Sequence, residues 1–484
     1  MKPIFSHPIV ALAAGLCLRL FFVFKYPANS GDTVLYEQMA TNWLQHHTYA
    51  MEVYGKIAPV DLRMPGYPAF LALVYGVTGR TGTDARLAVM LAQALVDLLS
   101  CVLIAILGAT LSLMVNERNR PQRVFIAALW LSTLCPFTAN YAAVPLTEVF
   151  AAFFTTAALL PLCLLVGRTR NNGWLFIKKN WRLANDYRYL AACAALLVGL
   201  GTLFRPEAPL LLLACWIVLG IVLVSQHEAM RWIRTVVGMG LACAIPLAPW
   251  AIRNAVTLHE FQFLAPKNSN LPRELVPYGF MSWEKTWLYR FREVYLVPWK
   301  LNEEAINVED IPGRAFDTPE EKARVAAILE PYNNDLTLTP EEDAAFGQLA
   351  RQRTARHPLR TYLWLPSARA VTMWFTPRIE LLPVSGTVFP LLQSWQDDRV
   401  DQSVTVGLFL LNIVYVALSI WGTVRLWRRS SAVRPAVALL IVFILLRTAF
   451  LTTLETPEPR YVLVCFPALI ALAAQVLSRP SESA

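Results

Sequence analysis

The chain has 484 residues, of which 56% are hydrophobic and 16% charged, and its formal net charge is +9 at pH 7. This composition is too apolar for a soluble protein of that length and indicates a chain that crosses a membrane several times. Its eight cysteines lie in apolar stretches without a CxxC spacing, so neither a disulfide framework nor a zinc site is predicted.

Long apolar runs predict the membrane spans, because a span needs about 20 mostly apolar residues. The first run follows a single lysine and lacks a small-residue cleavage site, so we interpret it as a retained span. Residues 66–78 are apolar but short, which is typical of a re-entrant or interfacial helix. The sequence predicts ten spans: 8–26, 86–115, 122–138, 146–167, 188–204, 208–225, 234–252, 404–426, 435–452 and 461–478.

A second helix is expected directly after the first span. The sequence from Ser30 to Asp32 breaks one helix and can cap the next. Tyr36, Ala40 and Leu44 follow at intervals of four, so they line one face of this helix. Because that face is only partly apolar, we expect the helix to lie on the membrane surface and to carry the Asp32 carboxylate to the lipid head groups.

The loops predict the orientation, since Lys and Arg collect in cytoplasmic loops. With the N-terminus inside, every inner loop is basic: 116–121, 168–188, the segment with Arg231 and Arg234, and 425–434. The positive net charge is therefore interpreted as a topology signal, and no nucleic-acid partner is predicted. Both termini are then cytoplasmic, in a multi-pass protein of the cell membrane.

The outer side receives a first loop, 27–85, and the long segment 253–403, besides short links. The long segment is rich in Trp, Tyr, Pro and mixed charge and is large enough for a small helical domain. The predicted fold is an all-α polytopic membrane protein with interfacial helices and an extracytoplasmic helical insertion. Its predicted parts are a transmembrane module at 1–252 with the first outer loop, the extracytoplasmic segment 253–403 and C-terminal transmembrane helices at 404–484.

Several charged and polar residues are predicted to face this same outer side. Charges close to a bilayer are costly and tend to mark pathways or sites. Their convergence from separate segments therefore favours a functional site. They are Asp32, Arg63, Glu148, Arg205, Glu207, Arg253, Asn254 and Arg460.

Structural roles remain open for each of these residues taken alone. Glu148 and Arg205 could pair with each other and simply hold two spans together. Arg253 and Arg460 could be interfacial anchors that extend their side chains to the head groups. Asp32 could serve only as the N-cap of the helix that follows it.

The order of these residues and their neighbours resembles the bacterial branch of the GT-C membrane glycosyltransferases. This branch includes relatives of the protein O-mannosyltransferases and of the lipid A aminoarabinose transferase. The resemblance runs from residue 8 to about 265 and returns at the last span. Its motifs are Asp32-x3-Tyr36-x3-Ala40, Arg63-x-Pro65-Gly66-Tyr67-Pro68, Leu146-Thr147-Glu148, Phe204-Arg205-Pro206-Glu207, Pro249-Trp250-x2-Arg253-Asn254 and Pro459-Arg460-Tyr461.

The resemblance implies a GT-C-like fold and an enzyme that takes a sugar from a polyprenyl phosphate. The sugar would pass to a glycan, lipid or protein acceptor at the extracytoplasmic face of a bacterial inner membrane. In such enzymes an acidic residue of the first outer loop is the general base, a role that carries over to Asp32. A carboxylate there suits an inverting displacement, because it can remove the proton of the attacking hydroxyl.

The same resemblance implies that guanidinium groups hold the lipid phosphate, which they bind through paired donors. Arg205 and Arg253 are the first candidates because they sit at span ends. The predicted donor-phosphate residues are Arg63, Arg205, Arg253 and Arg460, and the predicted substrate-positioning residues are Tyr36, Tyr67, Glu148, Glu207 and Asn254.

No cofactor and no metal are predicted. The oligosaccharyltransferases, relatives that use a metal, carry an Asp-x-Asp-like pair in the first outer loop, whereas Val34 stands at the matching position here. Asp61 lies too far along the chain to take that role. His46 and His47 are interpreted as a polar helix end rather than as metal ligands.

Two intramembrane charges, Asp97 and Arg447, are expected to pair between helices rather than to take part in chemistry. Two other functions stay open. A transporter or flippase of a lipid-linked or envelope substrate would also place charges in a membrane cavity, although it would more often show inverted repeats, which are not found here. A non-catalytic partner in a cell-envelope complex is the third possibility.

Overall fold

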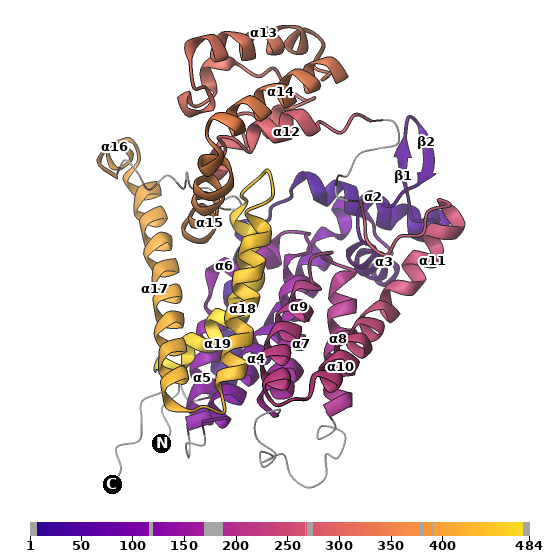
Figure 1. The fold of residues 1–484 in the computed structure, drawn as a ribbon. Helices are drawn as coiled ribbons and strands as arrows, with labels where there is room; N and C mark the ends of the chain where they lie inside the picture. Colours follow the sequence, from indigo (N-terminus) through magenta and orange to yellow (C-terminus); the bar gives the residue numbers. More distant parts are fainter. Residues whose placement is uncertain are drawn as a thin grey trace. The chain divides into compact units, whose positions relative to one another are not determined.

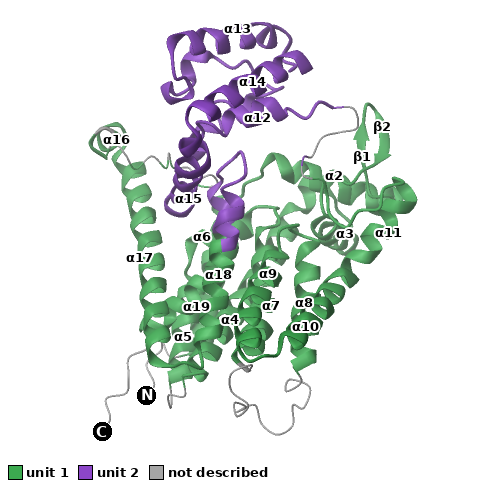
Figure 2. Cartoon of the chain, in the orientation of Figure 1, with its two compact units in different colours: residues 1–267, 379–445, 463–484 green, residues 268–378, 446–462 purple. Residues whose placement is uncertain are grey.

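The computed structural model describes residues 7–115, 120–168, 187–266, 274–376 and 391–477, together with the single positions 268, 382, 384, 386 and 388. The chain divides into two compact units (Figure 2). Unit 1 comprises 1–267, 379–445 and 463–484, and unit 2 comprises 268–378 and 446–462. Within the described ranges the chain is almost entirely helical, and the only sheet has two strands.

Unit 1 is built on long apolar helices, and a helix coincides with each of the ten predicted spans (Figure 1). They are α1 (Pro8–Lys25), α4 (Arg86–Leu113), α5 (Arg120–Thr133) with α6 (Pro136–Ala139), α7 (Glu148–Arg168), α8 (Tyr187–Thr202), α9 (Leu210–Ser225), α10 (Ala229–Ala244) with α11 (Ala248–Thr257), α17 (Arg399–Arg429), α18 (Arg434–Leu451), whose last residues belong to unit 2, and α19 (Phe466–Leu477).

Seven of these helices are long and apolar enough to cross a membrane, or eight if the bent pair around Thr133 counts as one span, within the residues that the structure describes. The multi-pass fold is thus confirmed, while the number of ten is not. The difference lies mainly in α8 and α9, which have only 16 residues each. A helix rises 1.5 Å per residue, so each is about 24 Å long and falls short of a hydrocarbon core of about 30 Å.

Small residues allow some of these helices to touch through their backbones. A Cβ atom on Gly422 of α17 would lie 1.9 Å from the Leu472 carbonyl oxygen of α19, and one on Gly199 of α8 would lie 2.3 Å from the Cys243 carbonyl oxygen of α10. Close approach through small residues is the usual way in which membrane helices gain packing energy, because burial from lipid supplies little.

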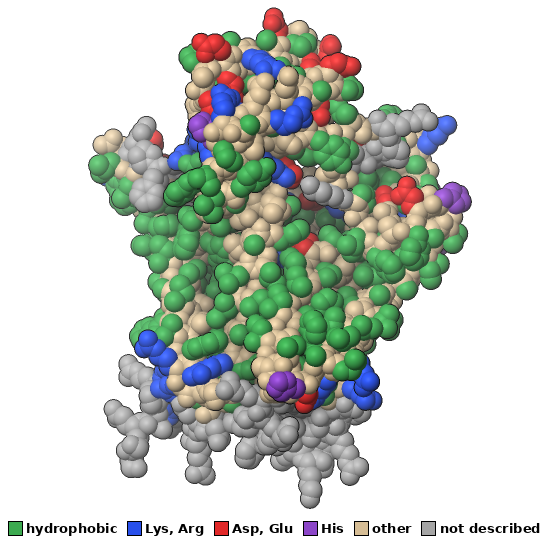
Figure 3. Space-filling model, in the orientation of Figure 1, with side chains coloured by type: hydrophobic (Ala, Val, Ile, Leu, Met, Phe, Trp, Pro, Cys, Tyr) green, Lys and Arg blue, Asp and Glu red, His purple; other side chains and the backbone are tan. Residues whose placement is uncertain are grey.

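The two ends of the helices of unit 1 differ in charge. On the face in Figure 3, hydrophobic side chains cover the middle of the molecule and Lys and Arg gather at the lower end. Helix ends rich in Arg meet there: Arg120 begins α5, Arg188 and Arg231 lie in the first turns of α8 and α10, and Arg429 and Arg434 end α17 and begin α18. Residues 116–119 and 169–186 of the predicted basic loops lie outside the described residues.

The first predicted outer loop folds at the opposite end, as α2 (Gly31–His46), a hairpin of β1 (Ala50–Val53) and β2 (Lys56–Pro59), and α3 (Gly66–Thr78) (Figure 1). The hairpin was not predicted. Val53 pairs with Lys56, and the two linking residues, Tyr54 and Gly55, both have positive φ, as the tightest hairpin turns require.

Helix α2 forms where it was expected, but its N-cap is Ser30, whose backbone N–H donates a hydrogen bond to the Thr33 hydroxyl oxygen at 3.1 Å. The alternative that Asp32 serves as the N-cap is therefore wrong, because Asp32 stands inside the first turn. Of the three residues predicted to share one face, Tyr36 and Ala40 are buried, whereas Leu44 is 39% exposed.

Unit 2 is a small helical body, as predicted for the insertion, although the predicted boundaries at 253 and 403 stay a prediction. It contains α12 (Tyr278–Glu284), α13 (Pro319–Asp335), α14 (Pro340–Arg356) and α15 (Leu365–Phe375), while α16 (Leu391–Asp397) belongs to unit 1. Its core is aromatic, with Trp283, Trp287, Tyr332 and Phe346 at most 1% exposed. Large rings in a small core bury much apolar area for few residues.

Candidate active site

The first ion pair of the candidate site joins α2 to the segment after β2. The Arg63 Nη2 atom donates to Asp32 Oδ1 at 2.6 Å, and both side chains remain about a quarter exposed. Burial alone lowers the pKa of Arg63, but the neighbouring Asp32 carboxylate and Tyr36 phenol raise this pKa more, so the net shift is upward. Arg63 therefore stays charged, and the Asp32 carboxylate stays accessible from outside.

A second ion pair joins the start of α7 to the segment after α8. The Arg205 Nη2 atom donates to Glu148 Oε1, and Arg205 Nη1 lies 4.0 Å from Glu207 Oε1. The Glu148 side chain is 3% exposed and that of Arg205 is 20% exposed. The sequence-based alternative that Glu148 and Arg205 pair with each other is thus correct as geometry, and the Arg205 side chain stays partly exposed.

Tyr36 lies between these two ion pairs. Its ring is 8% exposed and meets the Tyr67 ring edge to face at 5.1 Å. Burial, followed by the Asp32 carboxylate, raises the pKa of Tyr36 to about 12, and the charges of Arg63 and Arg205 oppose this rise. Since the charges of both pairs act on this phenol, both pairs lie near it. We call Asp32, Tyr36, Arg63, Glu148, Arg205 and Glu207 the Tyr36 cluster.

A backbone contact holds the two arginine segments together. The Gly66 N–H donates to the Leu203 carbonyl at 2.7 Å, three residues after Arg63 and two before Arg205. A Cβ atom on Gly66 would lie 2.6 Å from that carbonyl oxygen, a distance at which the backbone must move. This close backbone contact explains why the motif from Arg63 to Pro68 has a glycine at position 66.

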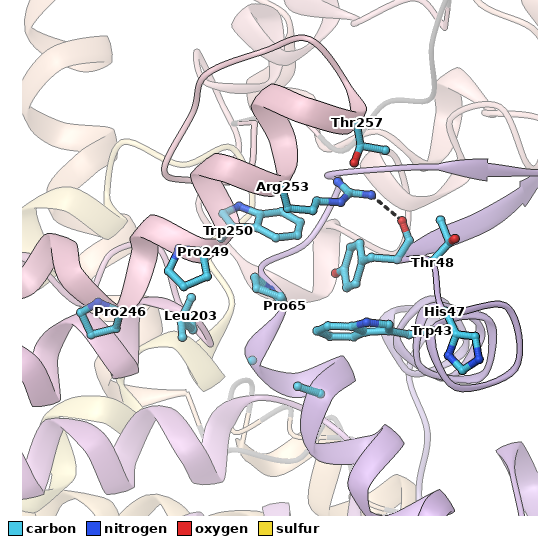
Figure 4. A pocket seen from close by; sticks show the side chains of 13 residues that line it. Trp43, His47, Thr48, Pro65, Leu203, Pro246, Pro249, Trp250, Arg253 and Thr257 are labelled. Carbon is cyan, nitrogen blue, oxygen red and sulfur yellow. Dashed lines mark hydrogen bonds between the residues drawn. The ribbon is translucent and has the colours of Figure 1, made fainter.

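A cavity of about 460 Å³ opens beside Gly66, between α2, α3 and α11 (Figure 4). Its walls are mostly aromatic and apolar, with one guanidinium group among them. The lining residues are Trp43, His47, Thr48, Tyr49, Pro65, Gly66, Ala69, Leu203, Pro246, Pro249, Trp250, Arg253 and Thr257. An apolar concave site with few polar groups is the usual form of a binding site for small molecules.

Arg253 lines this cavity but is largely engaged by the protein itself. Its guanidinium group donates to the Tyr49 carbonyl oxygen at 2.6 Å (Figure 4). It also donates to the Val60 carbonyl oxygen at 2.9 Å and to the Asn254 side chain. It also lies 5.2 Å from the Trp250 ring centre. Arg253 thus joins the residue before β1 to the residue after β2. Its predicted contact with phosphate stays a prediction.

Three other predicted residues lie away from the cavity surface or in the other unit. Tyr67 is fully buried, and its hydroxyl donates to Gln93 at 2.5 Å. Asn254 is also fully buried. Arg460 belongs to unit 2, where its Nε atom lies 2.5 Å from Glu458, so its predicted place beside the other arginines stays a prediction.

The residues weighed as metal ligands do not form a cluster. Asp61 accepts a hydrogen bond from Gln262, and His47 stands at the rim of the cavity. In the ranges that the structure covers, no three His, Cys, Asp or Glu side chains lie close enough to hold a metal ion. The prediction that no metal is needed stays a prediction.

The intramembrane charge at Asp97 pairs between helices, as predicted. Its partner is Arg19 of α1, whose Nη2 atom lies 2.6 Å away and whose side chain is fully buried. Arg447 instead donates to the Tyr461 carbonyl within unit 2. Arg19 was not predicted as this partner, although an arginine inside an apolar run indicates an intramembrane ion pair with an acid such as Asp97.

No protein-family model matches the chain, and no curated protein matches it in sequence. The chain is similar in structure to two membrane glycosyltransferases. One is the archaeal oligosaccharyltransferase AglB from Archaeoglobus fulgidus, in complex with an inhibitory peptide and a dolichol-phosphate, with TM-score 0.49 and 14% identity over 96% of this chain and 50% of that one.

The other is ArnT from Cupriavidus metallidurans bound to undecaprenyl phosphate, with TM-score 0.37 and 14% identity over 98% of this chain and 78% of that one. The chain spans about half the length of the archaeal enzyme. Both neighbours belong to the GT-C class that the sequence motifs resemble.

Proposed function

We propose that the chain is a membrane glycosyltransferase that moves a sugar from a polyprenyl phosphate to an acceptor hydroxyl, with inversion. The observation that supports this proposal is the Tyr36 cluster. It places an accessible carboxylate, that of Asp32, among two guanidinium groups that come from segments far apart in the sequence. A base and cationic phosphate ligands are the two elements that such a transfer requires.

Asp32 is the proposed general base. The acceptor hydroxyl attacks the anomeric carbon on the side opposite the phosphate, and a carboxylate within hydrogen-bond reach takes its proton. Asp32 is 28% exposed, so an acceptor can approach it, and its contact with Arg63 fixes the direction of the carboxylate. An aspartate held by its partner loses little freedom when the acceptor arrives.

Arg63 and Arg205 are the proposed ligands of the departing phosphate. A guanidinium group has five donors, so each can bind a phosphate oxygen and keep its carboxylate partner. Glu148 and Glu207 would hold Arg205 in the orientation that presents its accessible edge. Arg253 and Arg460 remain candidates for a second phosphate contact, and neither a metal nor a cofactor is part of the proposal.

The proposed site faces the extracytoplasmic side. The Tyr36 cluster uses the start of α7 and the segment after α8, whereas the Arg-rich helix ends mark the other end of unit 1. Because basic residues favour the cytoplasmic side, both termini would be cytoplasmic. The segment 253–403 is proposed to help select the acceptor, and unchanged acceptor choice after its deletion would contradict that role.

The test is sugar transfer by the purified full-length protein, with radiolabelled polyprenyl-phosphate sugar and a membrane extract as the source of acceptor. We expect transfer by the wild type and at least a hundredfold lower rate for Asp32→Asn, because a positioned base contributes about 10²- to 10⁴-fold. Equal thermal unfolding of the two proteins is the control for folding.

Transfer that Asp32→Asn leaves intact would remove the assignment of the base. Movement of the labelled lipid across the membrane without a new glycosidic bond would favour a transporter. No transfer by the wild type, but binding to envelope proteins, would favour a non-catalytic assembly partner.

A further inference from the structure

We propose that Tyr36 is a further catalytic residue of this site, and that its hydroxyl donates a hydrogen bond to the phosphate oxygen that leaves the sugar. The inference rests on the proposed function and deepens it. It assigns to one side chain a contact that the reaction needs at the breaking bond.

The first observation is that the Tyr36 hydroxyl is unused by the protein. The side chain is more than nine-tenths buried, and its hydroxyl makes no hydrogen bond with any residue that the structure describes. Two neighbouring tyrosines are different, because the Tyr67 hydroxyl donates to Gln93 and the Tyr49 hydroxyl donates to the Arg63 carbonyl. The Tyr36 hydroxyl is thus free to donate to a ligand without breaking a bond within the protein, and a hydrogen bond to a charged acceptor is among the stronger ones.

The second observation is where this hydroxyl lies. It is flanked by the Asp32–Arg63 pair and by the Glu148–Arg205 pair. Both guanidinium groups already share their charge with a carboxylate, whereas the phenol has a proton to donate and gives up no partner in doing so. A phosphate oxygen between the two arginines would therefore find Tyr36 as its neutral donor.

The protonation of Tyr36 decides between a donor and a base. Burial, and next the Asp32 carboxylate, raise the pKa of Tyr36 to about 12. The phenol is then fully protonated at neutral pH, which suits a hydrogen-bond donor and excludes a phenolate base. Asp32 keeps the role of proton acceptor.

The step balances as follows. The acceptor oxygen forms a bond to the anomeric carbon, and its proton passes to the Asp32 carboxylate. The bond between the anomeric carbon and the phosphate oxygen breaks, and its electron pair stays on that oxygen. The lipid phosphate gains one negative charge, which Arg63, Arg205 and the Tyr36 hydroxyl stabilise, while Tyr36 keeps its proton.

The test uses the full-length protein in lipid nanodiscs and compares the binding of undecaprenyl phosphate with that of undecaprenol, which lacks the phosphate. We expect the wild type to prefer the phosphate. Tyr36→Phe keeps the ring against Tyr67 and should lower the affinity for undecaprenyl phosphate about tenfold or more, the cost of one hydrogen bond to a charged group, without change for undecaprenol.

The matched control is Tyr75→Phe on α3. The Tyr75 hydroxyl also has no hydrogen-bond acceptor among the described residues, but Tyr75 lies outside the Tyr36 cluster, so this variant should bind both lipids like the wild type. The sugar-transfer rate should fall with the affinity in Tyr36→Phe and stay within twofold in Tyr75→Phe. The preference for the phosphate should also be constant from pH 7 to about 10, because Tyr36 titrates only at higher pH.

Affinity and transfer within twofold of the wild type in Tyr36→Phe would overturn the role of Tyr36 and leave the proposed function standing. A wild type that binds both lipids equally would overturn both. A phosphate preference that Tyr36→Phe abolishes, in a protein without any sugar transfer, would overturn the transferase and leave Tyr36 as a ligand of a lipid phosphate.

Discussion

Each unit contains a cluster of ion pairs, and the two clusters are built differently. In unit 2, Arg353 is completely buried, and its guanidinium group donates to Thr286, to Glu321 and to the Arg314 carbonyl. In unit 1, the arginines of the Tyr36 cluster are 20% and 23% exposed, and a hydroxyl among them has no protein partner.

The comparison separates a structural network from a candidate site. A buried guanidinium whose three nitrogens all have protein acceptors holds helices together and has nothing to offer a ligand. Ion pairs that stay partly exposed around a hydroxyl without a protein partner stabilise the fold less, but they can still bind a ligand. The number of charges therefore does not distinguish a binding site from a structural ion-pair network. The hydrogen-bond partners of each donor and the exposure of each side chain do.

The largest effect is expected from Arg353→Met in unit 2. This change removes the buried guanidinium partner of the Glu321 carboxylate and leaves only the exposed Arg356, 3.0 Å away. Breaking a buried ion pair costs about 3–5 kcal/mol in comparable pairs. Thermal unfolding in detergent, followed by the fluorescence of the buried tryptophans, measures it. The exposed neighbour Arg356 is the matched control, because Arg356→Met should cost about 1 kcal/mol or less. Equal losses of unfolding free energy in the two variants would contradict the view that the buried Arg353 network stabilises unit 2 more than the exposed Arg356 does.

A smaller effect, on activity rather than stability, is expected from Arg205→Lys. Lysine keeps the charge beside Glu148 but loses the paired donors that fit a phosphate. We expect transfer to fall about ten- to a hundredfold, which corresponds to about 1.4–2.7 kcal/mol in the transition state. Arg231→Lys at the basic end of α10 is the control and should transfer at the wild-type rate. An Arg205→Lys enzyme with unchanged transfer would show that this pair is structural, like that of Arg353.

The smallest effect is the pH dependence of unit 2 through Asp317. Burial raises the pKa of Asp317, but the hydrogen bond from Arg360 and the charge of Arg353 lower it more, so the pKa lies below its usual value. A lowered carboxyl pKa stabilises the folded state above the unfolded value of about 3.9, and this stability is lost as pH falls through the folded value.

Cleavage of unit 2 by pepsin in the full-length protein should therefore become faster below about pH 4. Asp317→Asn should be cleaved faster than the wild type at pH 4 to 5 and should show a weaker dependence on acid. Asp335→Asn, on the exposed side of α13, is the control and should follow the wild type. Identical pH profiles for Asp317→Asn and the wild type would contradict this role of Asp317.

Much of the fold was predictable because its signals are local. Apolar runs of membrane length, the helix after Ser30 and the face that holds Tyr36 and Ala40 depend on residues within a few turns of one another. The pairing of Glu148 with Arg205 was one of the alternatives that the sequence left open, because charges near a bilayer often pair between spans. The β hairpin was missed, because four-residue strands carry too little pattern to be distinguished from a loop.

The amino-acid order by itself determined that the chain is helical and crosses a membrane, and which side chains are available for a site. Only the tertiary structure decided that the Tyr67 hydroxyl donates to Gln93, whereas the Tyr36 hydroxyl has no partner among the described residues. It also decided that Arg253 donates to the carbonyls of the two residues that flank the β hairpin. The reason is physical. Helix periodicity is set by near neighbours, whereas a hydrogen-bond partner is set by which distant backbone and side-chain groups the packing brings within about 3 Å.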